Sequence, residues 1–397
     1  MTARHARGGV LLAALLLVAL NLRGPITALA PVVEDVGADL ALTPAAVGLL
    51  TGVPVLCFAA LTPVAAVALA RAGTTRMLAA TLVAILAGTL LRSFGGVPGA
   101  FAGMLVIGAA VTVGNVGVPT VVARDFPTQV PRAMGLFSAV MNAGAALTTL
   151  GTAPLASLMG WRWALASWGA LAVVALAVWA RVHAGVDGPP AAPTSVPGTV
   201  ATGPAVHVLR RPVTWLLCAA FVGQASSYYG ATTWLPSVLH DDAGLGRAAA
   251  GAAASLFQVL GVLGSVLAPF VLARRVPPRV VVVGVAACWL SLPVGLLLAP
   301  GGWAVWATLA GLAQGANFVL LFTVAAAAAG SPADVRRMSA TVQTVGYSVA
   351  AVTPSVLGAL HTASGGWTGP LLAVLGLLVL QVGTHTVAAG ALPRRTA

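Results

Sequence analysis

The sequence predicts an all-α membrane protein with twelve transmembrane helices, arranged as two parallel repeats of six. Three observations predict this fold class: the hydropathy, the spacing of the apolar runs and the distribution of arginine. The 397 residues have a mean hydropathy of +0.99, and 59% are apolar while only 7% are charged. Soluble domains carry about 25% charged residues, so this composition excludes an ordinary soluble protein.

The apolar runs are long enough to cross a bilayer as helices, since a hydrocarbon core of ~30 Å needs about 20 residues. In the first half we expect helices at 8–33, 45–69, 77–94, 98–123, 133–158 and 162–182. In the second half we expect them at 213–238, 248–272, 279–299, 302–329, 337–361 and 367–391.

The stretch 183–212 separates the two sets of helices. It contains "GPPAAPTSVPG" and has no hydrophobic period, which indicates a flexible linker in the part of the chain between the sets. The expected organisation is therefore a six-helix bundle at 1–182, a linker at 183–212 and a second bundle at 213–397.

The first apolar run has an alternative interpretation as a secretory signal peptide. Arg4 and Arg7 precede the run, and "ALA" at 28–30 resembles a cleavage site. Arg23 and Pro25 interrupt the run, however, and eleven more predicted helices follow. We therefore expect an uncleaved first helix.

Arginine supplies all twenty basic residues, and its distribution predicts the topology. With twelve helices, sixteen arginines fall on the side that holds both termini, whereas Arg92, Arg162 and Arg247 fall on the other. Basic residues favour cytoplasmic loops, so both termini and the linker are expected in the cytoplasm. The net charge of +12 then reflects topology and contact with lipid, and no nucleic acid is expected as a partner. Arg92 is expected to extend from its helix end to the membrane interface.

Two pairs of segments relate the halves. "ARAGTTR" (70–76) matches "ARRVPPR" (273–279) at an offset of 203, and "ITALAP" (26–31) matches "ATTWLP" (231–236) at an offset of 205. The second pair is followed in each half by an expected acidic outer loop. The acidic residues are Glu34, Asp35 and Asp39 in one loop and Asp241 and Asp242 in the other. Parallel repeats are typical of transporters that rock about a central site.

Six helices followed by six of the same orientation resemble the major facilitator superfamily. "ARAGTTR" resembles the basic loop signature of that superfamily, although Ala70 stands where the family has an acidic residue. A closer resemblance is to the cyanate and nitroimidazole permeases (the CynX/NimT type). The segments that carry it are "NLRGPIT" (21–27), "PVLCF" (54–58), "GNVGVPTVVARDFP" (114–127), "GAAL" (144–147), "GLAQGANF" (311–318) and "QTVGY" (343–347).

The resemblance implies a secondary active or facilitative transporter of small anions or small polar heterocycles. It implies alternating access about a central site between the halves, and helices one, four, seven and ten would line the cavity. The protein is expected to be a monomer in the cell membrane, with the bilayer and a small molecule as partners. The basic loops are expected to gate the conformational change through Arg71, Gly73, Arg76, Arg274, Arg275 and Arg279.

Arg23 is the leading candidate for a substrate contact. It lies about fifteen residues into a helix that begins near Gly8, roughly 22 Å from the cytoplasmic end at 1.5 Å per residue. The sequence places none of the eight carboxylates at that depth. A bound anion, or an electron-rich group such as nitro, would supply the opposite charge, and guanidinium offers a planar fork of donors for it. The structural alternative is a cation held by carbonyls that Gly24–Pro25 loosens.

Other polar and aromatic residues inside the predicted helices are candidate contacts, because such groups are costly at depth and usually face a cavity. By the repeat offset, Tyr228 is the counterpart of Arg23. The alternative is that amides and hydroxyls tie helices together, at about 0.5–2 kcal/mol each. The candidates are Thr27, Asn115, Asn142, Gln224, Tyr228, Tyr229, Trp234, Gln314, Asn317, Phe318, Gln343 and Tyr347.

Other functions are disfavoured by missing motifs. The sequence has no metal-ligand spacing, nucleotide-binding glycine loop or Walker A pattern, so we expect no enzyme, cofactor or metal. A non-transporting receptor would leave the polar, repeat-related helices unexplained. Transport of a small anion such as cyanate and efflux of a nitroimidazole-like heterocycle both remain open. No intramembrane proton carrier is identified, since His361 lies near a helix end.

Overall fold

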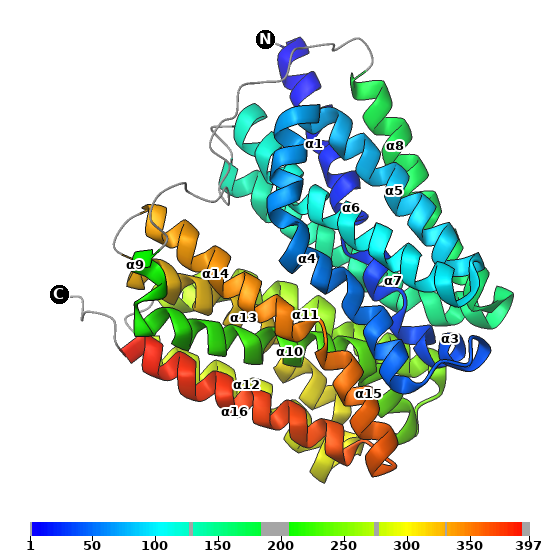
Figure 1. Ribbon diagram of the computed structural model, residues 1–397, viewed down its shortest axis with the longest axis vertical. Helices are drawn as coiled ribbons and strands as arrows, with labels where there is room; N and C mark the ends of the chain where they lie inside the picture. Colours follow the sequence, from blue (N-terminus) through cyan, green and yellow to red (C-terminus); the bar gives the residue numbers. More distant parts are fainter. Residues whose placement is uncertain (1, 127–129, 184–205, 274–277, 330–331, 391–397) are drawn as a thin grey trace. The chain divides into compact units, whose positions relative to one another are not determined.

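The computed structural model describes residues 2–126, 130–183, 206–273, 278–329 and 332–390, and all regular elements in these ranges are helices (Figure 1). Helices are expected because the bilayer core offers no water to backbone N–H and C=O groups, and a helix satisfies these groups internally. The chain forms two compact units: Met1–Ala41 with Val53–Thr199, and Leu42–Gly52 with Val200–Ala397.

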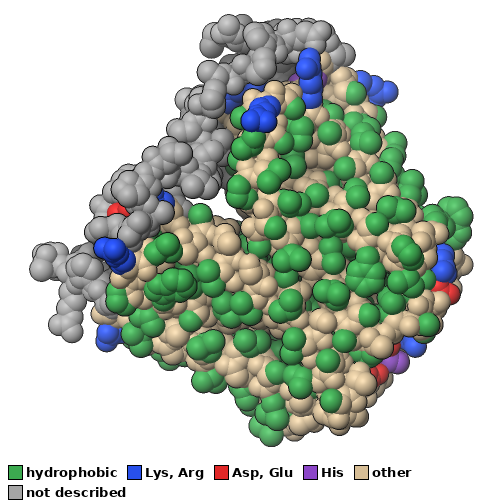
Figure 2. All heavy atoms as spheres, viewed as in Figure 1, with side chains coloured by type: hydrophobic (Ala, Val, Ile, Leu, Met, Phe, Trp, Pro, Cys, Tyr) green, Lys and Arg blue, Asp and Glu red, His purple; other side chains and the backbone are tan. Residues whose placement is uncertain are grey.

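The surface of the described residues is apolar, as a protein embedded in lipid requires. Leu158, Phe270 and Val64 are 81%, 68% and 60% exposed. On the face seen in Figure 2, hydrophobic side chains cover both units, and charged side chains lie at the margins of the view. The chain is therefore a multi-pass membrane protein and not a soluble one.

Nine helical segments in the described part of the chain are long and apolar enough to cross a membrane. One of them, Gly135–His183, has 49 residues and contains Gly160, whose φ of 78° interrupts the helix. Two further helices, α10 (Pro212–Asp241) and α14 (Pro332–Ala350), are not among the nine. Their polar residues lower the hydropathy, and these residues include several of the candidate contacts.

The first unit begins with an interrupted span. Its elements are α1 (Thr2–Leu20), α2 (Gly24–Thr27), the 3-10 helix η1 (Ala30–Val32), α3 (Val33–Asp39), α4 (Pro44–Ala72) from Val53 onward, α5 (Thr74–Phe94), α6 (Gly96–Asp125), α7 (Val130–Ser167) and α8 (Gly169–His183). α5 and α6 pack along each other (Figure 1), with a glycine from each helix at the crossing. A Cβ on Gly103 would lie 2.5 Å from the backbone nitrogen of Arg92, so this crossing requires glycine.

The second unit has a similar series of long helices. Its elements are Pro44–Gly52 of α4, α9 (Val206–Leu209), α10, α11 (Arg247–Ala273), α12 (Pro278–Leu298), the 3-10 helix η2 (Pro300–Gly302), α13 (Trp303–Ala328), α14, α15 (Thr353–Ser364) and α16 (Thr368–Gly390). α11 and α13 approach so closely that a Cβ on Gly315 would overlap the carbonyl of Gly261. Small residues at helix crossings allow this backbone approach in membranes.

Three predicted helices are not continuous: the sixth, predicted at 162–182, is interrupted at Trp168 between α7 and α8, and the other two are interrupted near a proline. The first, predicted at 8–33, is interrupted at 21–23 between α1 and α2, and the eleventh, predicted at 337–361, is interrupted between α14 and α15. Each of these two interruptions comes shortly before a proline, Pro25 or Pro354. Proline lacks an N–H donor and its ring clashes with the carbonyl four residues earlier, which explains both interruptions.

The residues expected in an acidic outer loop after the first span form a helix instead. Glu34, Asp35 and Asp39 lie in the short helix α3, with the first two in its first turn, where carboxylates favour the positive end of a helix. Of the predicted linker 183–212, residues 184–205 lie outside the described residues. Val206–Leu209 form the short helix α9.

Candidate functional site

Arg23 lies at the interruption of the first span. Its guanidinium Nη1 donates a hydrogen bond to Oδ1 of Asn142 on α7, and the arginine side chain is half-buried. The amide of Asn142 is itself oriented, because its Nδ2 donates to the carbonyl of Ser138 at 2.8 Å. Two of the predicted contact residues are thus together in the first unit, and Asn142 directs the guanidinium of Arg23.

Thr27 has a structural role next to this arginine. Its hydroxyl is buried and lies 3.1 Å from the hydroxyl of Thr148 and 3.3 Å from the carbonyl of Ala145. Thr148 also donates to the carbonyl of Gly24 at 3.1 Å. These bonds fasten α2 to α7, which favours the structural alternative for Thr27.

Asn115 is exposed on α6, close to the interrupted span. The residue before it, Gly114, has so little space that a Cβ there would overlap the side chain of Leu22. Leu22 is the residue before Arg23. The contact between Gly114 and Leu22 therefore brings Asn115 and Arg23 to the same level of the first unit.

Arg92 contradicts its predicted placement. We expected it to extend from its helix end to the membrane interface, but it is only 1% exposed. Its Nη1 donates to the carbonyl of Pro25 at 2.5 Å and lies 3.5 Å from Sδ of Met104. The physical reason is packing: α6 covers this face of α5 through the glycine crossing, so the side chain points into the unit.

Aromatic side chains form one connected group in the second unit, and it includes all three tyrosines of the chain. The ring centroids of Tyr228 and Tyr229 are 5.0 Å apart, those of Tyr229 and Tyr347 are 6.3 Å apart, and those of Tyr347 and Phe221 are 5.2 Å apart. Phe318 continues the group at 6.0 Å from Phe221. Four predicted contact residues are thereby brought together, and such edge-to-face pairs favour a fixed arrangement of rings. We call Phe221, Tyr228, Tyr229, Phe318 and Tyr347 the aromatic group.

Amide side chains form a second set of contacts, which is buried. Nδ2 of Asn317 donates to Oε1 of Gln224 at 2.5 Å, and Nε2 of Gln224 donates to the carbonyl of Gln314 at 3.1 Å. The side chain of Gln314 occupies the space above Gly261. These three predicted contacts link α10, α13 and α11 to one another, which favours the structural alternative for them.

Gln258 on α11 was missed by the sequence analysis. The hydroxyl of Tyr228 donates to its Oε1 at 3.0 Å, and its own Nε2 lies 3.5 Å from the hydroxyl of Thr232. Tyr228 is only 8% exposed, so this bond fixes the position of its ring. The available signal was a glutamine in the middle of an apolar run. It was passed over because α11 is the eighth predicted helix, at 248–272, and the family resemblance places only helices one, four, seven and ten around the cavity.

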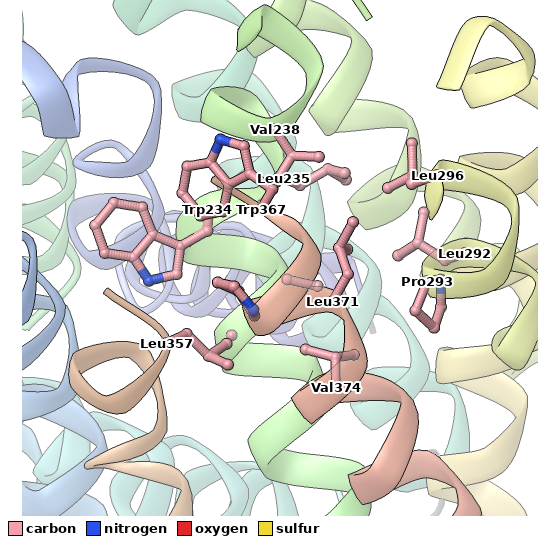
Figure 3. A pocket seen from close by; sticks show the side chains of 13 residues that line it. Trp234, Leu235, Val238, Leu292, Pro293, Leu296, Leu357, Trp367, Leu371 and Val374 are labelled. Carbon is pink, nitrogen blue, oxygen red and sulfur yellow. The ribbon is translucent and has the colours of Figure 1, made fainter. Parts of the chain in front are cut away.

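Trp234 lies apart from the aromatic group. Its Nε1 donates to the carbonyl of Pro354 at 2.9 Å, and its ring packs 5.5 Å from that of Trp367. Both indoles border a small pocket within the second unit, between α10, α12, α15 and α16 (Figure 3). The remaining wall is aliphatic, for example Leu357 and Leu371, so this pocket suits no anion.

The other predicted residues lie outside both groups. Gln343 is half-buried and its Nε2 donates to the carbonyl of Ser339 on the same helix at 3.3 Å. Arg71, Arg76 and Arg279 are exposed, and Gly73 has a φ of 84° that favours glycine at the turn between α4 and α5. Arg274 and Arg275 lie outside the described residues.

His385 on α16 is an ionisable residue inside a helix, and it was not predicted as one. His361 was the expected histidine near a helix end, yet His385 is fully buried, and neither of its ring nitrogens has a hydrogen-bond partner among the described residues. No cluster of three His, Cys, Asp or Glu side chains that could hold a metal occurs in the parts of the chain that the structure describes.

Long apolar helices in two units, with polar and ionisable side chains buried inside them, define a multi-pass transmembrane transporter rather than an enzyme. Residues 11–354 match the Major Facilitator Superfamily, and the chain belongs to this family. A 2-nitroimidazole transporter of Escherichia coli (strain K12) is 33% identical over 385 residues, covering 94% of each chain. The cyanate transport protein CynX of the same organism is 26% identical and covers 94% of this chain and 96% of its own.

Solved structures have the same fold at low identity. A bacterial homolog of the human lysosomal transporter Spinster has a TM-score of 0.77 at 16% identity, covering 97% of both chains. The nucleoside transporter NupG has a TM-score of 0.76 at 11% identity, covering 95% of this chain and 99% of its own. The predicted superfamily is thus confirmed, and so is the predicted similarity of this chain to nitroimidazole and cyanate transporters.

Proposed function

We propose that this transporter moves a small anion or small polar molecule of the cyanate type across the cell membrane by alternating access. The observation that carries the proposal is Arg23, a half-buried cation at the interrupted segment of a membrane-spanning helix. An ionisable residue at such a depth is costly and usually marks a substrate pathway. The hydrogen bond to Asn142 holds one edge of the guanidinium, which gives a bound anion an oriented fork of donors.

A preference for small anions is also supported by the relative named as a cyanate transport protein. Cyanate is small, linear and singly charged, so one oriented guanidinium is sufficient to bind it. Exposed Asn115, at the level of Arg23, is a second candidate donor.

A second candidate function is efflux of a nitroimidazole-like heterocycle, which the aromatic group favours. Tyr229, Tyr347 and Phe318 combine partly exposed rings with edge-to-face neighbours, and such rings can stack on a flat substrate. The relative named as a 2-nitroimidazole transporter supports this candidate. A nitro group is also an acceptor for Arg23, so both candidates use the same cation.

The proposed topology has twelve spans with both termini in the cytoplasm. The 49-residue segment Gly135–His183 counts as two spans, and α10 and the pair of α14 and α15 add two to the remaining eight. The proposed organisation keeps bundles at 1–182 and 213–397 joined by the cytoplasmic linker 183–212. We propose that the protein acts as a monomer, with the basic loops, Arg71 to Arg76 and Arg274 to Arg279, gating the conformational change.

Uptake of labelled cyanate and of labelled 2-nitroimidazole into proteoliposomes, with and without a pH gradient, tests the proposal. The purified parental protein should transport at least one of the two, and Arg23→Ala should lose at least about 90% of the rate, because charged contacts at depth dominate binding. Arg162→Ala is the matched control, since Arg162 is a half-exposed arginine paired with Asp39. Parental transport by a correctly inserted Arg23→Ala variant would refute the role of Arg23, and transport of neither compound would refute the substrate class.

A further inference from the structure

Arg92 is a fully buried cation that the proposed substrate contacts do not use. It is 1% exposed, and its Nε and Nη2 have no hydrogen-bond partner among the described residues. A buried charge in such surroundings costs stability, and an apolar side chain of similar volume often costs less. Its Nη1 donates to the carbonyl of Pro25, two residues after Arg23.

The position of Arg92 is fixed from the side of α6. A Cβ on Gly103 would lie 2.5 Å from the backbone nitrogen of Arg92 and 2.8 Å from its Cα, so the two backbones are in contact. Sδ of Met104 lies 3.5 Å from Nη1 and flanks the guanidinium. Arg92 therefore reaches the interrupted span from a rigid pair of helices.

The segment that Arg92 holds is one that helical hydrogen bonds leave loose. α2 has only four residues, Gly24–Thr27, and a helix this short pairs few of its carbonyls with backbone donors; the carbonyl of Gly24 accepts from the N–H of Ala28 at 2.9 Å. The carbonyl of Gly24 accepts from the hydroxyl of Thr148 on α7, and the carbonyl of Pro25 accepts from Arg92 on α5. The two bonds come from different helices and hold consecutive residues.

We propose that Arg92 is a positioning residue for substrate binding, which fixes the backbone after Arg23 and thereby sets the direction of the Arg23 guanidinium. This inference rests on the proposed role of Arg23. Arg92 does not touch the substrate in this scheme. It keeps Gly24 and Pro25 in place so that Arg23 and Asn142 stay aligned, and loss of its bond lets the segment and Arg23 shift together.

Kinetics of Arg92→Met and Arg92→Lys in proteoliposomes test the effect on binding. Arg92→Met keeps the length of the side chain but has no donor, and it should raise KM about tenfold with Vmax within about twofold, since only alignment is lost. Arg92→Lys keeps one charged donor and should restore most of the affinity. Arg162→Met is the control for loss of an arginine, and Met104→Leu is the control for altered packing beside Arg92.

A double-variant cycle separates positioning from a general structural role. In the Arg23→Lys background the guanidinium to be aligned is absent, so Arg92→Met should change KM by less than about twofold. An equal change of KM in both backgrounds would overturn the inference, because Arg92 would then act independently of Arg23. If Arg92→Met does not insert into the membrane, the smaller change Arg92→Lys is measured in both backgrounds with the same criterion.

Hydrogen exchange gives a readout that needs no substrate. Arg92→Met should increase deuterium uptake in peptides covering 21–29 and leave peptides from α8, 169–183, unchanged. Unchanged uptake in 21–29 would show that Arg92 does not hold the segment and would overturn the inference even if Arg23 is essential. If Arg23→Ala transports normally, the proposed role of Arg23 fails, and so does the inference that Arg92 aligns a substrate contact. Increased deuterium uptake in 21–29 would in that case still show that Arg92 holds the segment.

Discussion

The segment 22–31 of the first unit and the segment 227–236 of the second are counterparts in the repeat, yet they have different structures. The first, "LRGPITALAP", contains the interruption between α1 and η1, whereas the second, "SYYGATTWLP", is an uninterrupted part of α10. In the first segment, side chains from α5 and α7 bond to backbone carbonyls. In the second, the side chains of the segment itself make the contacts, such as Tyr228 with the side chain of Gln258 and Trp234 with the carbonyl of Pro354.

One position accounts for much of this difference. Pro25 corresponds to Gly230, so only the first unit has a proline that removes a helical hydrogen bond at this level. Both segments end in a proline, Pro31 and Pro236, and Pro236 lies within α10 without ending it. Arg23 therefore lies in the segment where the first unit differs from its counterpart in the second.

The largest expected effect comes from placing a second interruption in α10. Gly230→Pro should lower the free energy of unfolding by about 3 kcal/mol or more, because it removes a hydrogen bond inside a long helix. Thermal unfolding in detergent measures this change. Gly230→Ala is the matched control, since its Cβ would meet only side chains, that of Leu357 at 2.6 Å and that of Thr353 at 3.7 Å among the described residues. Similar unfolding of the two variants would show that packing, and not the backbone, maintains the continuity of α10.

Removing the interruption in the first span should reduce affinity. Pro25→Ala supplies the missing N–H, so α1 can continue into α2 and carry Arg23 away from Asn142, which should raise KM about tenfold. The measurement is transport in proteoliposomes, and Pro31→Ala, beyond the interruption, is the control. An unchanged KM would mean that Pro25 does not determine where Arg23 points.

Asn142→Asp distinguishes the two candidate substrates. An aspartate beside Arg23 would neutralise it, so affinity for an anion should fall at least about tenfold while that for a neutral heterocycle changes by less than about threefold. Competition by both compounds against labelled substrate measures the ratio. Asn142→Leu, which removes the acceptor without adding charge, is the control, and equal losses for both compounds would contradict an anion-selective Arg23.

The smallest expected effect concerns the side-chain contacts of α10. Gln258→Leu removes the acceptor of the Tyr228 hydroxyl and should lower the free energy of unfolding by about 0.6 kcal/mol, the average for hydrogen bonds between membrane helices. Tyr228→Phe should have a similar effect, and the double variant should add little, as chemical unfolding can measure. Fully additive losses would show that the two side chains do not depend on each other.

The sequence predicted the positions of the helices well, because one strong physical effect determines them. Apolar runs locate helices well, because every backbone group in hydrocarbon must be paired, and α5, predicted at 77–94, spans Thr74–Phe94. The interruptions were not predicted, although Pro25 and Pro354 were visible, because many membrane helices accommodate proline. Neighbouring helices determine the outcome at each one.

The candidate site was predicted less completely, because depth along a helix does not tell which neighbour a side chain meets. Arg92 is close to a helix end, and the sequence could not show that α6 covers it. Gln224 and Asn317 were expected as candidate contacts, and the sequence could not show that Nδ2 of Asn317 donates to Oε1 of Gln224 while Oδ1 of Asn317 has no partner among the described residues. The pairing of Arg23 with Asn142 joins residues 119 positions apart, and no local pattern encodes such a contact.

The glycine crossings set limits for anyone who wishes to retarget this transporter. At Gly103 and Gly315 any added atom would meet the backbone of a neighbouring helix, so a mutational library that includes them would mostly yield protein that does not assemble. Better positions to randomise are Asn115, Phe318 and Tyr347, whose side chains are at least partly exposed. New specificities should therefore arise from changes at a few exposed side chains, while the glycines at the helix crossings stay unchanged.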